Sequence, residues 1–355
     1  MQDDDAIIDL RSDTVTKPCA GMLAAMADAR VGDDQYGEDI ATNELLDFVA
    51  DLLGKARALW LPSGTMANQV ALRVATRPGD DVIVSREAHS VWHELGGSAA
   101  NAGVHMTEIG CDGHFDLAQF EAAIKPQNHH IYPPTTMVQI EQTHNRASGT
   151  VFSPDTAMQI CEMAKSAHIF SYMDGARLWN AAVATGIDIK ELAAPFDAVM
   201  VSLSKGLGAP GGSILAGSAR FIDQAVRQRR IFGGAMRQTG YYAAAGQYAL
   251  AHNLTRLSDD HTHSRTLAQV LATCEHIEID VQKVQTNIIV FNLKSGTISA
   301  PELVRAAKEK GVLMNALGPR KLRLVTHLDV SAEACIKAAE LIADILTHQP
   351  HPCAA

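Results

Sequence analysis

The segment Phe196-Asp-Ala-Val-Met-Val-Ser-Leu-Ser-Lys-Gly-Leu-Gly-Ala-Pro-Gly-Gly-Ser213 joins an apolar run to a single lysine and a glycine-rich loop. The run from Val199 to Val201 predicts a buried strand, and the glycines after Lys205 prevent regular structure from continuing. In α/β folds, ligands bind outside the carboxyl ends of the strands, which is where Lys205 would lie. The glycines at 206, 208, 211 and 212 would let the backbone pass close to a bound group. Alone, such a lysine is more often a surface residue, so its function depends on the rest of the chain.

Strands and helices alternate through the first part of the chain. Predicted strands cover residues 81–85, 104–109, 135–141, 169–173, 196–202 and 213–216, and predicted helices cover residues 43–53, 90–101, 117–124 and 154–167. This pattern predicts an α/β fold with a mainly parallel sheet covered by helices. A helical stretch (218–275) and an α+β tail (277–347) then indicate a smaller C-terminal domain. We expect an N-terminal arm at 1–17 that reaches the active site, a large domain at 18–250 and a small domain at 251–355.

Composition excludes several classes of protein. A net charge of −10 argues against nucleic acid and anionic membranes as partners, and no apolar run approaches the length of a membrane span. The six cysteines are isolated from one another, which favours reduced thiols over a disulfide framework or zinc. The acidic start of the chain does not resemble a signal peptide. We therefore expect a cytoplasmic protein without a metal site.

Other polar residues follow predicted strands and could complete a site around Lys205. Lysine forms imines with carbonyl compounds, notably pyridoxal phosphate (PLP). Asp174 follows a strand and could keep a pyridine nitrogen protonated, although it could equally be a helix N-cap. Arg177 could bind a carboxylate with two hydrogen bonds. Ser63-Gly64-Thr65 begins a helix, where backbone N–H groups can hold a phosphate or only cap the helix.

Two histidines also follow predicted strands. His89 comes after the strand at 81–85, and His144 comes after the strand at 135–141. A single loop histidine is more often a surface residue, but two on the lysine-bearing edge of one sheet are candidates for ring stacking or proton transfer. The acidic loop at 31–39 is compatible with either a surface turn or a subunit contact.

The chain resembles the L-threonine aldolases of the low-specificity and L-allo types over nearly its whole length up to about residue 330. Seven motifs occur in the order of that family: Asp9-Leu-Arg-Ser-Asp-Thr-Val-Thr16, Val31-Gly-Asp-Asp-x-Tyr-Gly-Glu-Asp39, Pro62-Ser-Gly-Thr-Met-Ala-Asn68, Glu141-x-Thr-His-Asn145, Asp174-Gly-Ala-Arg177, Leu203-Ser-Lys-Gly-Leu-Gly-Ala-Pro210 and Gly233-Gly-Ala-Met-Arg-Gln238. The resemblance implies PLP as cofactor and the fold of aspartate aminotransferase. It also implies a homotetramer of two dimers, with active sites at the dimer interface.

The resemblance also implies roles for individual residues. For the cofactor, Lys205 would bind the aldehyde carbon, Asp174 would face the ring nitrogen and His89 would stack on the ring. Gly64 and Thr65 would bind the phosphate, and Arg177 would lie nearby. Arg237 would contact the phosphate across the subunit boundary. For the substrate, Ser12, Arg177 and Arg323 would bind the carboxylate. The chain departs from the family at Gln142, where Asn is usual, and at 210–212, where Pro-Val-Gly is usual.

The implied reaction is cleavage of a β-hydroxy-α-amino acid into glycine and an aldehyde. His89 or His144 would be the base, directly or through a water, and we expect Tyr36, Glu94 and His144 near the substrate. Two alternatives remain: another PLP enzyme of this fold, such as a β-eliminating lyase or an aminotransferase, and a catalytically silent PLP-binding protein. The paired histidines favour the aldolase, and the intact Lys205 argues against a silent protein.

Overall fold

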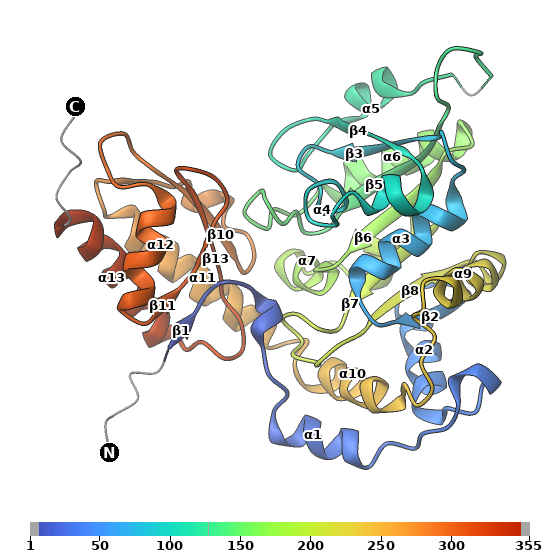
Figure 1. Ribbon diagram of the computed structural model, residues 1–355, viewed down its shortest axis with the longest axis horizontal. Coiled ribbons are helices and arrows are strands. Elements are labelled where there is room, and N and C mark those ends of the chain that lie inside the picture. The colour runs from blue at the N-terminus through green and yellow to red at the C-terminus, as the bar shows by residue number, and fades with distance from the viewer. Residues whose placement is uncertain (1–6, 127, 349–355) are drawn as a thin grey trace.

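A seven-stranded sheet forms the centre of the computed structural model, which describes residues 7–126 and 128–348 (Figure 1). Its strands run in the order β2-β8-β7-β6-β5-β3-β4. They are β2 (Arg57–Leu61), β3 (Asp81–Ser85), β4 (His105–Ile109), β5 (Thr135–Glu141), β6 (Phe170–Gly175), β7 (Ala198–Ser202) and β8 (Ser213–Gly217). The five strands from β7 to β4 are parallel, and β8 is antiparallel to both β7 and β2. The mainly parallel sheet is confirmed.

Helices cover both faces of this sheet, so its strands are apolar on both sides. On β7, Val199 and Val201 pack into one hydrophobic cluster, whereas Met200 points into another, as the alternation of side chains in a strand requires. The Met200 face carries α3 (Gly64–Ala75) and α9 (Ala219–Ile231). The opposite face carries α2 (Ile40–Leu52), α6 (Pro154–Ser166), α7 (Leu178–Thr185), α8 (Ile189–Ala193) and α10 (Gly240–His252).

A second, antiparallel sheet lies on the other side of the molecule (Figure 1). Its order is β12-β13-β10-β9, with β9 (Ile277–Glu278), β10 (Ile288–Leu293), β12 (Asn315–Ala316) and β13 (Lys321–Val325). The helices α11 (Leu257–Ala272), α12 (Ala300–Glu309) and α13 (Ala332–His348) accompany it. On α11, Leu257 joins the large cluster and Leu267 the small one. Since α11 contributes to both clusters, the predicted domain division near residue 250 stays a prediction.

The N-terminal arm pairs with the C-terminal part of the chain. Strand β1 (Ile8–Asp9) runs parallel to β11 (Val312–Leu313), and a short helix, η1 (Asp13–Val15), follows it. Shorter elements complete the fold: α1 (Ala20–Ala27), η2 (Asp34–Tyr36), α4 (His89–Trp92), η3 (Ser98–Ala102), α5 (Leu117–Ala123) and η4 (Val281–Lys283). Within the described residues, no helix is both long enough and apolar enough to cross a bilayer.

The prediction of one helix over residues 90–101 is wrong. Helix α4 ends at Trp92, and a separate π-helical turn occupies Ser98–Ala102. Between them Leu95 and Gly96 adopt left-handed backbone angles, with φ of 53° and 71°, which interrupt a right-handed helix. The interruption turns Glu94 into the interior while Leu95 stays fully exposed.

Two glycines of the lysine loop combine left-handed backbone angles with close contacts to other parts of the protein. Gly212 has φ of 103°, and a Cβ there would lie 2.6 Å from Nε1 of Trp60. A Cβ at Gly208, where φ is 81°, would lie 2.7 Å from Leu328. Both positions therefore need glycine for backbone angle and for space.

Gly212→Ala should lower the free energy of unfolding by roughly 1–3 kcal/mol through backbone strain, plus the contact with Trp60. Gly79→Ala is a matched control, because Gly79 has φ of 93° with open space around its Cβ position. Urea unfolding of both variants measures the difference. Equal losses would show that Trp60 does not constrain the loop.

Candidate active site

A cavity of about 380 Å³ lies where the carboxyl ends of the central strands face the second sheet. Ser12, His89, Arg177, Lys205 and Arg323 line it, so five residues predicted from the sequence meet in one place. Their positions follow from the topology: His89 comes after β3, Arg177 after β6 and Lys205 after β7, while Arg323 lies on β13. The arm supplies Ser12. The parallel strands thus gather these groups at one sheet edge.

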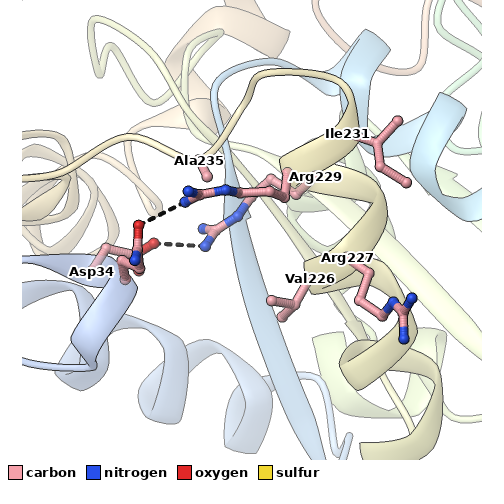
Figure 2. A pocket seen from close by; sticks show the side chains of 8 residues that line it. Asp34, Val226, Arg227, Arg229, Ile231 and Ala235 are labelled. Carbon is pink, nitrogen blue, oxygen red and sulfur yellow. Dashed lines mark hydrogen bonds and ion pairs between the residues drawn. The ribbon is translucent and has the colours of Figure 1, made fainter.

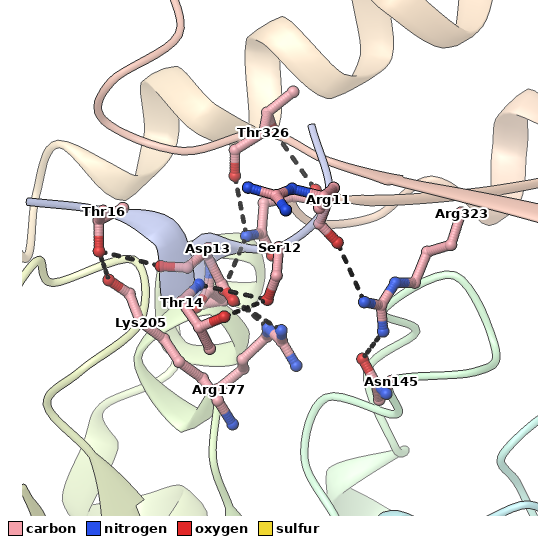
Figure 3. Close-up of polar contacts among 12 residues, drawn as sticks. Arg11, Ser12, Asp13, Thr14, Thr16, Asn145, Arg177, Lys205, Arg323 and Thr326 are labelled. Atoms are coloured by element: carbon pink, nitrogen blue, oxygen red, sulfur yellow. Dashed lines mark hydrogen bonds and ion pairs between the residues drawn. The ribbon is translucent and has the colours of Figure 1, made fainter. Parts of the chain in front are cut away.

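Arg177 forms a bidentate ion pair with Asp13, a residue of the predicted arm to which the sequence analysis assigned no individual role (Figure 3). The distances from Arg177 Nε and Nη2 to the carboxylate oxygens are 2.8 and 2.7 Å. Asn287 Nδ2 also donates to Asp13, at 3.1 Å. Burial opposes ionisation of Asp13, but the Arg177 guanidinium outweighs it and lowers the pKa of Asp13 to about 2. The run of polar residues Ser12-Asp13-Thr14 in the arm was the sequence feature that could have indicated this role.

Lys205 is half-buried and lies in the loop that follows strand β7. Thr16 Oγ1 donates to its backbone carbonyl at 3.1 Å, which fixes the arm against the lysine loop. Burial and the charge of Arg177 lower the pKa of Lys205. A lysine with a lowered pKa is more often a neutral amine, the form that attacks a carbonyl carbon.

Asp174 is buried at the end of β6 and belongs to a hydrogen-bonded network that reaches His89. Asn68 Nδ2 donates to Asp174 Oδ2 at 2.8 Å and to Glu94 Oε1 at 2.7 Å. His89 Nδ1 lies 2.9 Å from the same Glu94 oxygen. Burial and the nearby charge of Glu141 raise the pKa of Asp174. A buried carboxyl group without a cationic partner in direct contact suits a protonated ring nitrogen.

His89, Glu94 and Asp174 place metal-ligating atoms within 4.8 Å of one another. The amide group of Asn68, however, donates to both carboxylates and so occupies the space between them. We interpret the cluster as a hydrogen-bonded network and not as a metal site.

The start of α3 offers a seat for a phosphate. Ser63 caps the helix by accepting from the Met66 N–H, and the first N–H groups of any helix have no partner inside it. A Cβ at Gly64 would lie 3.5 Å from Ser213 Oγ, a buried hydroxyl without a hydrogen-bond partner among the described residues. Thr65 beside it is exposed. With the amine of Lys205 and the acid of Asp174, these groups fit PLP.

His144 is placed differently from His89. Its side chain is only 2% exposed, it does not line the cavity, and its Nε2 lies 3.8 Å from Glu141 Oε2. Within the described part of the chain, neither of its ring nitrogens has a hydrogen-bond partner. His89 therefore has the more direct access to a substrate.

Tyr36 and Arg237 do not line this cavity within one chain, so the role of Tyr36 near the substrate stays a prediction. Tyr36 is 71% exposed at the end of η2. Arg237 donates to the side chain of the adjacent Gln35 at 2.6 Å. Asp33 caps the turn that carries Tyr36, and the Asp34 N–H of that turn donates to the Arg237 carbonyl at 3.0 Å, so the two segments lie side by side.

His93 lines the cavity and was not predicted from the sequence. It follows His89 by one helical turn, and the two ring centroids are 5.3 Å apart. Burial, together with the positive charges of His89 and Arg146, lowers the pKa of His93. A neutral imidazole thus faces the cavity beside His89. The one-turn spacing was the signal that could have identified it.

Comparison with known proteins is consistent with this site. Residues 9–294 match the family model described as beta-eliminating lyase. The low specificity L-threonine aldolase of Escherichia coli is 40% identical over 335 residues, which is 94% of this chain and 97% of that protein. The chain belongs to the L-threonine aldolase family. Low-specificity L-threonine aldolase 1 of Arabidopsis thaliana is 37% identical over 91% of this chain and 92% of that one.

Solved structures confirm the fold that the family resemblance implied. The threonine aldolase of Leishmania major has a TM-score of 0.80 at 19% identity, covering 96% of this chain and 99% of that chain. A structure of SPT with PLP has a TM-score of 0.72 at 13% identity, covering 95% and 87%. At these identities the likeness shows the fold alone. The aspartate-aminotransferase-like architecture is thus confirmed by the structures, while membership of the family rests on the sequence relatives.

Asp13→Asn should lower the free energy of unfolding at pH 7 by about 2 kcal/mol or more, because the carboxyl pKa falls from 3.8 to about 2 on folding. This stabilisation is present above pH 3.8 and is lost as the pH falls through 2. The difference between wild type and variant should therefore shrink below pH 4 in acid-dependent urea unfolding.

Asp9→Asn is the control for that experiment, since Asp9 pairs with the exposed Arg11 and such surface pairs contribute about 0–1 kcal/mol. Equal effects of the two substitutions would contradict the importance assigned to the buried pair.

Proposed function

We propose that the protein is a PLP-dependent carbon–carbon lyase that cleaves L-threonine, L-allo-threonine or related β-hydroxy-α-amino acids into glycine and an aldehyde. The observation that carries this proposal is the meeting of Lys205, His89 and two arginines at one cavity, with the buried Asp174 linked to His89 through Asn68 and Glu94. The chain is also 40% identical to a low specificity L-threonine aldolase. When bound, PLP supplies an electron sink for the breaking Cα–Cβ bond.

The residues that would hold PLP come from the large sheet. Lys205 Nζ would bind its aldehyde carbon, and Asp174 would keep a proton on the ring nitrogen. The N–H groups at Gly64 and Thr65 would bind the phosphate. His89, half-buried at the cavity wall, would stack on the ring.

The substrate carboxylate would lie between Arg177 and Arg323. Because Asp13 engages only Nε and Nη2 of Arg177, the Nη1 group stays available for a second carboxylate. Arg323 donates to Asn145 Oδ1 at 2.7 Å and to the Arg11 carbonyl at 3.1 Å (Figure 3). Burial lowers the pKa of Arg323 to about 10, so it remains charged at neutral pH. The Ser12 hydroxyl lies at the same wall.

His89 is the base that the geometry favours for the β-hydroxyl proton, directly or through a water, because it lines the cavity and His144 does not. A β-eliminating lyase is the second candidate, favoured by the description of the matching family model. Elimination from threonine would yield a keto acid and ammonia without glycine, so the products distinguish the two reactions.

We infer a homotetramer of two dimers, in which Tyr36 and Arg237 reach the site of a partner subunit. Large apolar side chains are exposed nearby: Val226 and Ile231 line a cavity with Gln35, and Met236 directly precedes Arg237. Figure 2 shows Ile231 and Arg227 projecting from α9 while Arg229 extends to Asp34, 2.6 Å away. A cavity of about 490 Å³ lies between them. Such mixed apolar and arginine-rich surfaces are typical of interfaces. We also propose a cytoplasmic location and a role in glycine and amino-acid metabolism.

Purified protein with PLP should release aldehyde and glycine in equal amounts from L-threonine, L-allo-threonine or L-phenylserine. Lys205→Ala should lose the visible absorbance of bound cofactor and lower turnover by about a thousandfold or more. Chromatography quantifies the aldehyde and the glycine, and visible absorbance measures the bound cofactor. Near-wild-type turnover in Lys205→Ala, or keto acid in place of glycine, would reject the proposed reaction.

Mixing inactive Lys205→Ala with impaired Arg237→Ala should restore activity if each site combines Lys205 of one subunit with Arg237 of the other. After denaturation and refolding together, half of the dimers are hybrids with one intact site, so roughly a quarter of wild-type activity is expected. Refolding each variant alone is the control. Absence of restored activity would show that Arg237 serves no partner site.

A further inference from the structure

Glu94 is buried next to His89 and faces three hydrogen-bond donors. Its side chain is 0% exposed, and it does not line the cavity. Oε1 accepts from Asn68 and Oε2 from Gln69, both at 2.7 Å. His89 Nδ1 completes the set at 2.9 Å. Since an ionised carboxylate can only accept hydrogen bonds, the proton of a neutral His89 must be on Nδ1.

The orientation of Asn68 is fixed by groups on both sides of its amide. Tyr172 Oη donates to Asn68 Oδ1 at 2.8 Å, and burial raises the pKa of Tyr172 well above its ordinary value, so it stays a donor. The NH2 group must then face Asp174 and Glu94, as both accept from it. The single side chain of Asn68 therefore fixes the positions of both the Asp174 and Glu94 carboxylates, and Glu94 in turn fixes the ring of His89.

We propose that Glu94 is a positioning residue that keeps a proton on Nδ1 of His89, so that His89 takes up and releases its other proton at Nε2, the ring nitrogen left for the cavity. The proposal rests on the proposed function, in which His89 accepts the β-hydroxyl proton. Nε2 would gain the β-hydroxyl proton as the Cα–Cβ bond breaks and the aldehyde forms, and would return a proton, directly or through a water, to Cα of the glycine product.

The charges around His89 define what loss of Glu94 would change. The groups that face His89 are His93 at the end of α4, Glu94, Glu141 on β5, Asp174 on β6 and Lys205 after β7. Burial lowers the pKa of His89, but the hydrogen bond with Glu94 and the charges of Asp174 and Glu141 outweigh burial and Lys205, so the pKa is raised. Glu141 binds the His89 backbone N–H at 2.7 Å, whereas Glu94 contacts the ring.

Glu94→Gln keeps the size of the side chain and removes its charge, so His89 should lose its proton at a lower pH. Diethyl pyrocarbonate acylates neutral imidazole, and mass spectrometry of the peptide containing His89 measures this reaction in the full-length protein without PLP. At pH 6 the rate at His89 should rise several-fold relative to wild type. With PLP, the acidic limb of kcat/KM should move in the same direction. Glu94→Asp, which keeps the charge, should return both profiles toward wild type.

Gln69→Met is the matched control, because it removes a donor to the same carboxylate and leaves the charge beside His89 unchanged. It should leave the pH dependence of labelling as in wild type. An unchanged profile in Glu94→Gln, or an equal shift in Gln69→Met, would overturn the role of Glu94. Labelling needs no turnover, so a wild-type protein that releases no aldehyde would reject the proposed function separately.

Discussion

The buried ion pair between Asp13 and Arg177 joins the three parts of the chain that form the cavity. Asp13 comes from the N-terminal arm, Arg177 follows strand β6 of the large sheet, and Asn287, which donates to Asp13, precedes β10 of the small sheet. Removing one partner of a buried pair leaves an uncompensated charge, at a cost of about 3–5 kcal/mol. If the arm dissociated, the guanidinium of Arg177 would either become exposed to water or stay buried without its carboxylate partner. Beyond the pair, β1 anchors the arm to β11.

Electrostatic balance at the site follows from this pairing. Asp13 neutralises Arg177. Arg323 donates to the neutral oxygens of Asn145 and Arg11, and no carboxylate of the described residues forms an ion pair with it. Such a cation attracts a carboxylate strongly, since its surroundings have a low dielectric constant. Nη1 of Arg177 makes no hydrogen bond among the described residues and would be available to the same carboxylate. In the proposed function, recognition of the carboxylate would therefore use both arginines.

Most strands and helices could be predicted because each buries an apolar face, and the spacing of its apolar residues is visible within a short stretch of sequence. Strand β5, for example, has the predicted bounds Thr135–Glu141. Asp13 could not be assigned in this way, because its partner Arg177 is 164 residues away and only tertiary structure brings the two together. Glu94 was expected near the substrate, but the break at Leu95 buries it behind His89.

The two sheets contribute different residues to the site, so the site needs both parts of the chain. Asp174 and Lys205, which would hold the cofactor, follow strands of one rigid parallel sheet. Arg323 lies on β13 of the other sheet, opposite Val290 and Asn315. A carboxylate bound by Arg323 and Arg177 together would bridge the sheets, adding an attraction to the one that Asp13 already provides. If the proposed carboxylate site is correct, substrate binding and the packing of the small sheet on the large one would be coupled, since both would depend on the same guanidinium groups.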